Sequence, residues 1–435
     1  MNKFQLIVLA VFGFLFLAGV IAFSMGKASG SKVSNITVWG IINKTPMSEV
    51  LMATGLDKSK TLKIDYTFVS QDELESRLIN ALAEGRGPDV VIAPQQLVIK
   101  ERAKFLEVPY SSYPQRTFFD TFVNNASVLA DDNGIIAFPV LVDPIVTYWN
   151  KRLFSNALLP NAPKTWTDLQ NKVVPALVKK TDDGLDINTA AVAMGAWDNI
   201  VNAKKILSSL LIQSGTPIFT YDGSKVLNFF ASNPYNAPVN PAQASLVFYS
   251  DFANQTKSNY TWNNSKKSDQ VEFLSENLAM YFGLSSEYKS IKEKNPNLSF
   301  DVGLFPQGEA SKVNSVFGDM IVLAVTRSSK DVAGSLNFVG QMTGSIAQSA
   351  LSSRLYLPPA RKDLLSVFPA DDKVMTTFYQ SAQVSKSWYD IDAGQTSEIF
   401  RTMVRDVNSG RKTVSQAVPS ADASLYSLIS NYAKK

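Results

Sequence analysis

Two kinds of apolar periodicity alternate along the first part of the chain. Residues 36–39 (ITVW) form a short β-branched and aromatic run, and residues 62–68 alternate apolar with polar side chains, as half-buried strands do. Thr45-Pro46 has the pattern of a helix start, and an apolar stripe at helical spacing covers 74–82. Residues 90–93 (VVIA) are apolar throughout, which is typical of a central parallel strand. This β-α-β-α-β order predicts a doubly wound α/β sheet.

The alternation of strands and helices continues to the C-terminus. Residues 135–139 and 146–149 are predicted strands, separated by a turn at Asp143-Pro144, since Asp before Pro is a good turn former. Ser70 with Glu73 has the pattern of a capping box, and Thr165 that of an N-cap. Further strands are expected at 278–282, 300–305 and 320–325, and helices from Asp198 to Gly215 and at 330–342, 371–382, 396–407 and 413–431.

The N-terminal segment contains a long apolar stretch. Residues 6–23 carry no charge or strongly polar group, and with Ser24 and Met25 the stretch reaches 20 residues, about what a helix needs to cross a bilayer. A secretory signal usually has an apolar region of only about 7–15 residues, which favours a retained transmembrane anchor over 1–26. Ala22-Phe23-Ser24 leaves cleavage as the alternative. Residues 27–35 are expected to form a flexible tether to extracytoplasmic soluble lobes.

Composition excludes several function classes. The chain has no His and no Cys, so it can contain neither a Ser–His–Asp triad, nor a Cys nucleophile, nor a thiolate zinc site. A net charge of +4 over 435 residues provides no concentrated basic face for nucleic acid. Neither GxGxxG nor GxxxxGK[ST] is present. We therefore expect no metal, no cofactor and no nucleic-acid partner, while 45% hydrophobic residues can fill sizeable cores.

Six segments occur together in an order and spacing that are specific as a set. They are AEGRGPDVVIA (83–93), IAFPVLVDPIVTYWNKRLF (136–154), PKTWTDL (163–169), AMYFG (279–283), DVGLFP (301–306) and SGRKTV (409–414). With these segments, the chain resembles the bacterial extracellular solute-binding proteins of the maltose-binding type, the substrate receptors of ABC importers.

The resemblance implies a two-lobed, periplasmic-binding-protein-like clamshell behind the N-terminal transmembrane helix. Each lobe would be a doubly wound sheet with flanking helices. The N-terminal lobe would comprise 36–142 with about 307–344, and the C-terminal lobe 143–306 with about 345–435. No reaction is implied: a solute enclosed between the lobes stabilises the closed form, which the ABC permease subunits distinguish from the open one.

The resemblance also implies ligand-contacting positions, which are only partly matched. Where the family places polar contacts, this chain has Asn43, Lys44, Gln96 and Asp143. Where the sugar receptors place stacking tryptophans, it has Ala93, Leu284 and Ser397. The polar positions are matched in kind, so a small polar solute such as a carbohydrate is expected. The lost aromatic faces argue against a maltose-like ligand.

Replacement aromatic platforms can be sought at strand ends and helix starts. The candidates are Trp197, Tyr281, Phe317 and Trp388, with Trp39 as a further possibility. The alternative for each is core packing, since an aromatic side chain in or beside a strand is more often buried. Trp197, in an apparent loop after Gly-Ala, is the best placed to face a cleft.

Three function classes fit these observations. The first is a membrane-tethered solute receptor, without enzymatic activity, that serves an ABC importer. The second is a carboxylate-based glycoside-acting enzyme, which needs no His but two suitably spaced acids. The third is a surface sensor or interaction protein that kept the clamshell without transport. The ordered motif set favours the receptor.

Overall fold

The structure is a computed structural model that describes residues 33–181, 186–233, 237–309 and 313–432. The expected anchor over 1–26 lies outside the described residues, as does most of the expected tether, since Ser34 already belongs to the first strand. Within the described ranges, no helix has the length and apolar character needed to cross a membrane.

The N-terminal lobe is built on the three parallel strands expected from the periodicity. β1 (Ser34–Gly40) lies between β2 (Leu62–Phe68) and β3 (Val90–Pro94). The apolar stripe of α3 (Gln71–Ala83) is buried against this sheet. The lobe also contains α2 (Lys44–Ala53), α4 (Gln95–Lys100), β4 (Val108–Pro109), α5 (Gln115–Thr121), β5 (Gly134–Ile135), α13 (Val332–Met342), α14 (Ser345–Leu355) and α15 (Lys362–Leu365).

The C-terminal lobe is built around β11 (Leu278–Leu284), which pairs in parallel with β8 (Ile187–Val192). Helix α9 (Ala203–Gln213) begins later than predicted, because Asp198 lies in a preceding turn and pairs with Arg401. The lobe also contains α6 (Lys151–Asn156), α7 (Trp166–Asp168), α8 (Val174–Leu177), β7 (Lys179–Lys180), β9 (Phe219–Tyr221), β10 (Val226–Asn228), α10 (Pro241–Asp251), α11 (Asp269–Leu274), α12 (Glu287–Lys294), β12 (Phe300–Gly303), α16 (Lys373–Gln383), α17 (Ala393–Asn408) and α18 (Val414–Tyr432).

Three strands lie where the lobes meet: β6 (Phe138–Asn150), β13 (Val316–Val325) and β14 (Ser385–Lys386). The predicted turn at Asp143-Pro144 is wrong, since β6 runs straight through it. Its first half pairs with β13 as far as Pro144, and its second half pairs with β11 and β12. These partners hold the Asp-Pro step extended, a conformation that the residue before proline favours in any case.

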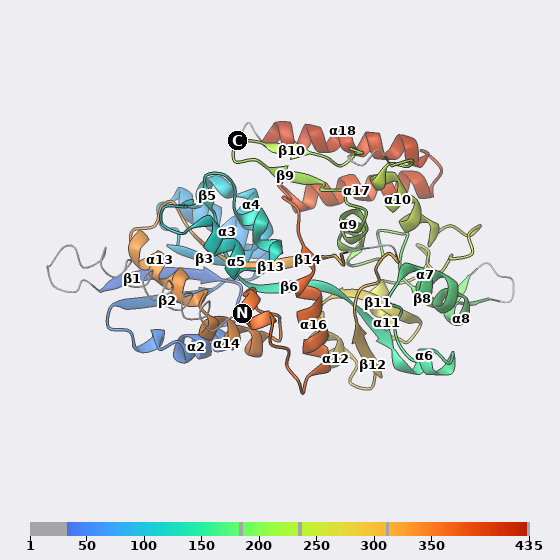
Figure 1. Ribbon diagram of the computed structural model, residues 1–435, viewed down its shortest axis with the longest axis horizontal. Coiled ribbons are helices and arrows are strands. Elements are labelled where there is room, and N and C mark those ends of the chain that lie inside the picture. Colours follow the sequence, from blue (N-terminus) through green and yellow to red (C-terminus); the bar gives the residue numbers. More distant parts are fainter. Residues whose placement is uncertain (1–32, 182–185, 234–236, 310–312, 433–435) are drawn as a thin grey trace.

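The strands of the two lobes form one hydrogen-bonded sheet rather than two separate ones. Its order is β2-β1-β3-β13-β6-β11-β8-β7, with β12 and β14 paired beside this path. Figure 1 shows β6 and β13 between the two bodies, with helices on both sides of the sheet. The antiparallel pair β6 and β13 therefore links the lobes at their centre.

Two separate hydrophobic clusters mark the two lobes. One contains residues of β1, β2, β3 and the first half of β6, and the other contains β8, β11 and the second half of β6. The predicted boundary at 345 differs from this division. Ala347 and Leu351 of α14 are buried in the N-terminal cluster, where α14 packs on α2. The chain returns to the C-terminal cluster after α14, first through the partly buried Tyr356 and then through Met375 of α16.

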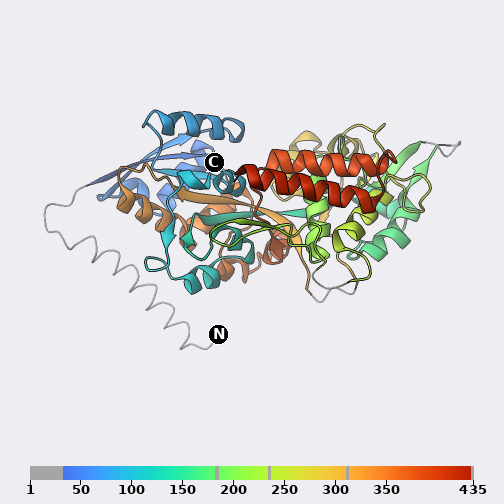
Figure 2. The same ribbon diagram turned by 90° about the horizontal axis from the view of Figure 1, so that it is seen from above.

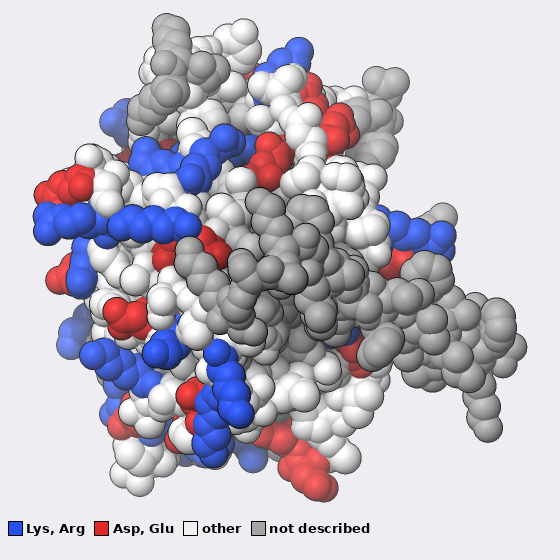
Figure 3. All heavy atoms as spheres, turned by 90° about the vertical axis from the view of Figure 1, so that its left-hand side faces the viewer, with Lys and Arg blue, Asp and Glu red and all other residues white. Residues whose placement is uncertain are grey.

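The outer views show how the helices and charges are distributed. Figure 2 shows α17 and α18 side by side along the C-terminal lobe, in agreement with their extensive contact. Figure 3 looks at the outer end of the N-terminal lobe, where basic and acidic side chains are interspersed over the described part of that face. That distribution differs from the single-sign face of a nucleic-acid binder.

Candidate functional site

Polar side chains gather where strands from both lobes end or cross. The loop after β1 stays beside β3 because Ile41 N donates to Ile92 O at 3.2 Å. Asn43 and Lys44 follow in this loop and are exposed at the start of α2, while Gln95 and Gln96 follow β3 directly. The carboxyl ends of parallel strands are where α/β sheets bind ligands, so this edge is the candidate site.

Two carboxylates oppose each other at the crossing strands. Asp143 of β6 and Asp319 of β13 are direct partners in the antiparallel register. Asp143 Oδ1 accepts hydrogen bonds from Ser285 Oγ (2.8 Å) and Ser286 N (2.9 Å), and Asp319 accepts one from Gln96 Nε2. Burial raises the pKa of Asp143 to about 6 and raises the pKa of Asp319 as well. Like charges placed opposite one another reinforce the effect on Asp143.

A buried amide network lies beside this pair. Asn125 Nδ2 donates to Gly318 O at 2.8 Å, Ser387 Oγ also donates to Gly318 O, and Gln95 Nε2 donates to Ser387 Oγ at 2.8 Å. Gln95 and Asn125 are 2% and 0% exposed, yet Gln95 Oε1 and Asn125 Oδ1 have no hydrogen-bond partner among the residues that the structure describes. A buried acceptor without a donor carries a cost in free energy. A hydroxyl group of a ligand or a water molecule that donates to it would remove this cost.

Cationic groups come to the site from the start of α9. Lys204 Nζ forms an ion pair with Asp390 and donates to Ala393 O at 2.8 Å and Thr396 Oγ1 at 2.6 Å. The positive charges of Lys205 and Lys204 oppose the burial-driven rise of the pKa of Asp319. The site thus presents both donors and acceptors, as recognition of a polyhydroxylated solute requires.

The four predicted stacking residues lie inside the C-terminal lobe. Tyr281 has no exposed surface, and its hydroxyl donates to Glu287. Trp388 is 3% exposed, packs edge-on against Phe219 and donates from Nε1 to Ser208 Oγ at 3.3 Å. Trp197 and Phe317 are each 8% exposed and belong to the same core cluster. Of the four rings, Trp388 contacts the polar site, where Lys204 Nζ lies 5.2 Å from its centroid, but the four are not gathered around that site.

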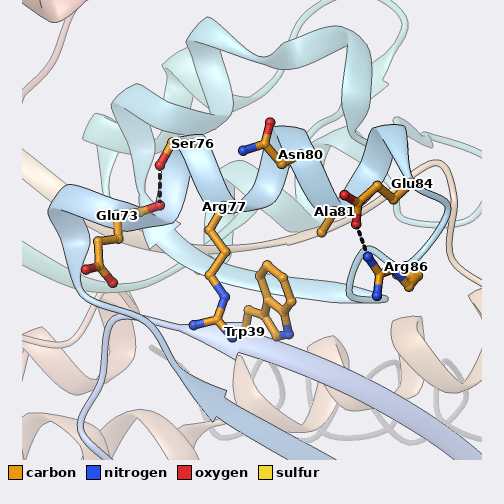
Figure 4. A pocket seen from close by; sticks show the side chains of 8 residues that line it. All are labelled: Trp39, Glu73, Ser76, Arg77, Asn80, Ala81, Glu84 and Arg86. Carbon is orange, nitrogen blue, oxygen red and sulfur yellow. Dashed lines mark hydrogen bonds and ion pairs between the residues drawn. The ribbon is translucent and has the colours of Figure 1, made fainter.

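A pocket of about 550 Å³ lies elsewhere, between β1 and α3 (Figure 4). The Trp39 ring forms one side of it, with the Arg77 guanidinium 4.8 Å from the ring centroid. Its lining side chains all come from β1, α3 and the loop after α3, so they belong to one lobe. A solute bound there would not join the two lobes, which separates this pocket from the candidate site.

The sequence prediction included Asn43, Lys44, Gln96 and Asp143 but missed much of the network. Gln95, Asn125, Lys204, Asp319 and Ser387 were not predicted. Asp319 had a usable signal, because it is an acid inside an otherwise apolar strand, VFGDMIVLAV. The contacts of Asn125 and Ser387 with Gly318 join segments far apart in sequence and carried no local signal. Within the described ranges, no group of His, Cys, Asp or Glu side chains could hold a metal ion.

Comparison with solved structures shows the fold. The chain superposes on a cyclo/maltodextrin-binding protein complexed with maltotetraose (TM-score 0.74, 16% identity, 93% of this chain and 99% of that one). It also matches the cyclic α-maltosyl-1,6-maltose binding protein of Arthrobacter globiformis (0.75, 15%, 92% and 100%) and the GacH receptor of Streptomyces glaucescens (0.68, 16%, 92% and 100%). These likenesses establish the two-lobed α/β fold expected above.

Sequence comparison establishes the family. Among curated proteins, no sequence matches this chain. The family model described as bacterial extracellular solute-binding protein matches residues 57–377, well over half of the 435 residues. The match covers both lobes and the crossing strands β6 and β13. The chain therefore belongs to the bacterial extracellular solute-binding proteins.

Proposed function

We propose that this protein is a membrane-tethered extracytoplasmic receptor that captures a carbohydrate between its lobes and delivers it to an ABC import permease. The observation that carries the proposal is the set of polar side chains from both lobes at the crossing strands, with Asp143 and Asp319 in register. Solved relatives of this fold hold maltotetraose or acarbose, which supports a carbohydrate ligand. Delivery to a permease is inferred from family membership.

The binding mode follows from the hydrogen-bond capacity of the site. Carboxylates can accept hydrogen bonds from the hydroxyl groups of a sugar, the buried amide oxygens of Gln95 and Asn125 can accept further ones, and the Lys205 ammonium can donate. Ala93, Leu284 and Ser397 supply no aromatic face at the family's stacking positions. We therefore propose a ligand held mainly by hydrogen bonds, with Asn43, Lys44 and Gln96 at its N-terminal-lobe side.

Ligand identification tests this proposal directly. Mass spectrometry of co-purified solute, followed by a thermal-shift screen over sugars, peptides and polyamines, should identify a carbohydrate. A ligand at 100 times its Kd should add about 2.7 kcal/mol to the free energy of unfolding. A screen in which only peptides or polyamines stabilise the protein would contradict the carbohydrate assignment, and turnover of a glycoside would favour an enzyme instead.

Asp143 provides the sharpest test of the site. Asp143→Ala should weaken binding by about 1.5–3 kcal/mol, the usual range for hydrogen bonds to a charged group, or about tenfold to a hundredfold and more in Kd. Calorimetry should be done well below the melting temperature, because losing the bonds to Ser285 and Ser286 also costs stability. Asp65 of β2 is an exposed carboxylate on a strand, so Asp65→Asn is the control and should leave the affinity unchanged. Unchanged affinity with reduced stability would make Asp143 a structural residue only.

A further inference from the structure

A hairpin of the C-terminal lobe contacts the N-terminal lobe. Its two strands form a separate two-stranded sheet and are not part of the sheet that joins the lobes. We call residues 219–228 the strap; they comprise β9, a turn and β10, with Val226 paired to Tyr221. The turn is closed by Asp222, which accepts from Lys225 N at 2.8 Å, and by Gly223 at φ +86°, where a glycine is favoured. Figures 1 and 2 both place the strap beside α18.

The base of the strap is fixed in the C-terminal lobe. Phe219 is 1% exposed and packs edge-on against Trp388, with ring centroids 5.5 Å apart. Asn228 Nδ2 donates to Asp422 Oδ1 of α18 at 2.9 Å. The strap therefore moves with this lobe.

The tip of the strap contacts the N-terminal lobe at two points. Asn133 Nδ2 donates to Gly223 O at 2.9 Å. The Arg102 guanidinium lies 4.6 Å from the centroid of the Tyr221 ring, and it is held there by ion pairs with Asp131 and with Glu107 (2.8 Å). A guanidinium oriented by two carboxylates is preorganised for a cation–π contact. Both points are broken if the lobes separate.

Further contacts between the lobes lie next to the strap. Tyr432 OH, near the end of α18, donates to Ile99 O of α4 at 3.0 Å, and Lys100 of α4 lies 3.8 Å from Asp392 Oδ2. Tyr389 stacks on Tyr221 at 5.0 Å and 14°. Its neighbour Asp390 pairs with Lys204 at the candidate site. The strap is thus connected to the groups that would contact a solute.

We propose that the strap is an interlobe latch that holds the receptor closed in the absence of solute and must release before solute enters or leaves. Opening about the crossing strands would separate Arg102 from Tyr221 and Asn133 from Gly223 together. Each contact favours the closed over the open form by a factor in the equilibrium constant. When several weak contacts break together, these factors multiply. The inference rests on these contacts between the lobes and not on the chemical class of the ligand.

The test measures the lobe equilibrium without any ligand. Because the chain has no cysteine, Thr117→Cys in α5 and Ser415→Cys in α18, both exposed, give a unique label pair across the lobes. In Asn133→Ala/Tyr221→Ala, distance measurement by electron spin resonance should show a closed-to-open ratio about tenfold lower than in the labelled parent. Tyr426→Ala, which removes a ring that is 67% exposed on α18, should leave the distribution unchanged. A double variant with the parental distribution would overturn the latch.

A crosslink keeps the proposal testable if that variant folds poorly. A Cβ built at Gly223 would lie 3.4 Å from Asp132 Cβ, near the separation that a disulfide spans. Asp132→Cys/Gly223→Cys should therefore form an intramolecular disulfide under mild oxidation of the unliganded protein, measured by loss of free thiol. The two single-cysteine variants control for intermolecular bonds, and a parental melting temperature of Gly223→Cys must first show that the φ of +86° tolerates a side chain. Thiols that then stay free would show an open strap and overturn the proposal.

Discussion

At the residue scale, Asp269 shows how burial sets the charge of a side chain. It is 1% exposed, and its Oδ1 accepts from Val201 N (3.0 Å) and Gln270 N (2.8 Å). Burial raises its pKa to about 7, and Glu287 nearby adds to the shift. An unfolded aspartate titrates near 3.9, so folding takes up a proton between these two values. The contribution of Asp269 to the free energy of unfolding should therefore fall as pH rises from about 4 to 7 and level off above.

Asp269→Asn should reduce this pH dependence. The amide oxygen can still accept both backbone hydrogen bonds, and no charge has to be buried at neutral pH. We expect the variant to be at least as stable as the parent at pH 8, with a gain of a few kcal/mol at most, and to lose part of the slope between pH 5 and 7. Urea titrations at several pH values measure this, with the exposed Asp363→Asn as the control. An unchanged slope would show that Asp269 is ionised throughout.

At the element scale, the helix caps show that a residue with the right sequence pattern does not always form the capping hydrogen bond. Thr165 accepts from Asp168 N at 3.1 Å, which confirms the predicted cap. Ser70 occupies the predicted N-cap of α3, but its side chain makes no capping bond, so the predicted capping box is wrong. Asp331, which was not predicted, caps α13 by accepting from Gly334 N at 2.8 Å. A cap therefore requires the side-chain rotamer as well as the residue type.

This contrast predicts unequal effects of alanine at two cap positions. Asp331→Ala should lower the free energy of unfolding by about 1 kcal/mol, because the first turn of α13 loses its acceptor. Ser70→Ala, at the same position of α3, should change it by only a few tenths. Both helices belong to the N-terminal lobe, so chemical denaturation can compare the two variants directly. Equal losses would mean that Ser70 caps α3 in solution.

At the scale of the whole molecule, the expected N-terminal anchor would decide where the protein works. We expect residues 6–23 to be retained, since their apolar length exceeds that of a usual signal peptide. The mature protein should then stay in the membrane fraction and resist extraction by high salt, while detergent should release it. N-terminal sequencing of the purified protein shows directly whether residues 6–23 are still present. A start at Met25 or later, with the protein free in the medium, would identify a removed signal.

The extent of prediction differs between fold and site for physical reasons. Strand β2 and the helices near the C-terminus were predicted from local periodicity, because one-sided burial leaves its period in the sequence, whereas β11 was predicted from a continuous apolar run. Gln96 and Asp143 were expected only through resemblance, and the structure places Gln96 on Asp319, the partner of Asp143. The ligand role of these residues stays a prediction. For the aromatic candidates, core packing was the alternative left open, and only the tertiary structure decided for it, because burial depends on partners distant in the chain.

By itself, the sequence determined the class of this protein: alternating α/β periodicity, no His or Cys chemistry, an apolar N-terminus and a family-specific set of segments. The tertiary structure alone decided what depends on pairing across long separations. Asp143-Pro144 has the local pattern of a turn, yet β13 on one side and β11 with β12 on the other hold it in a continuous strand. Likewise, nothing local connects Arg102 with Tyr221. Local propensities are worth tenths of a kcal/mol, and the packing of a whole lobe outweighs them.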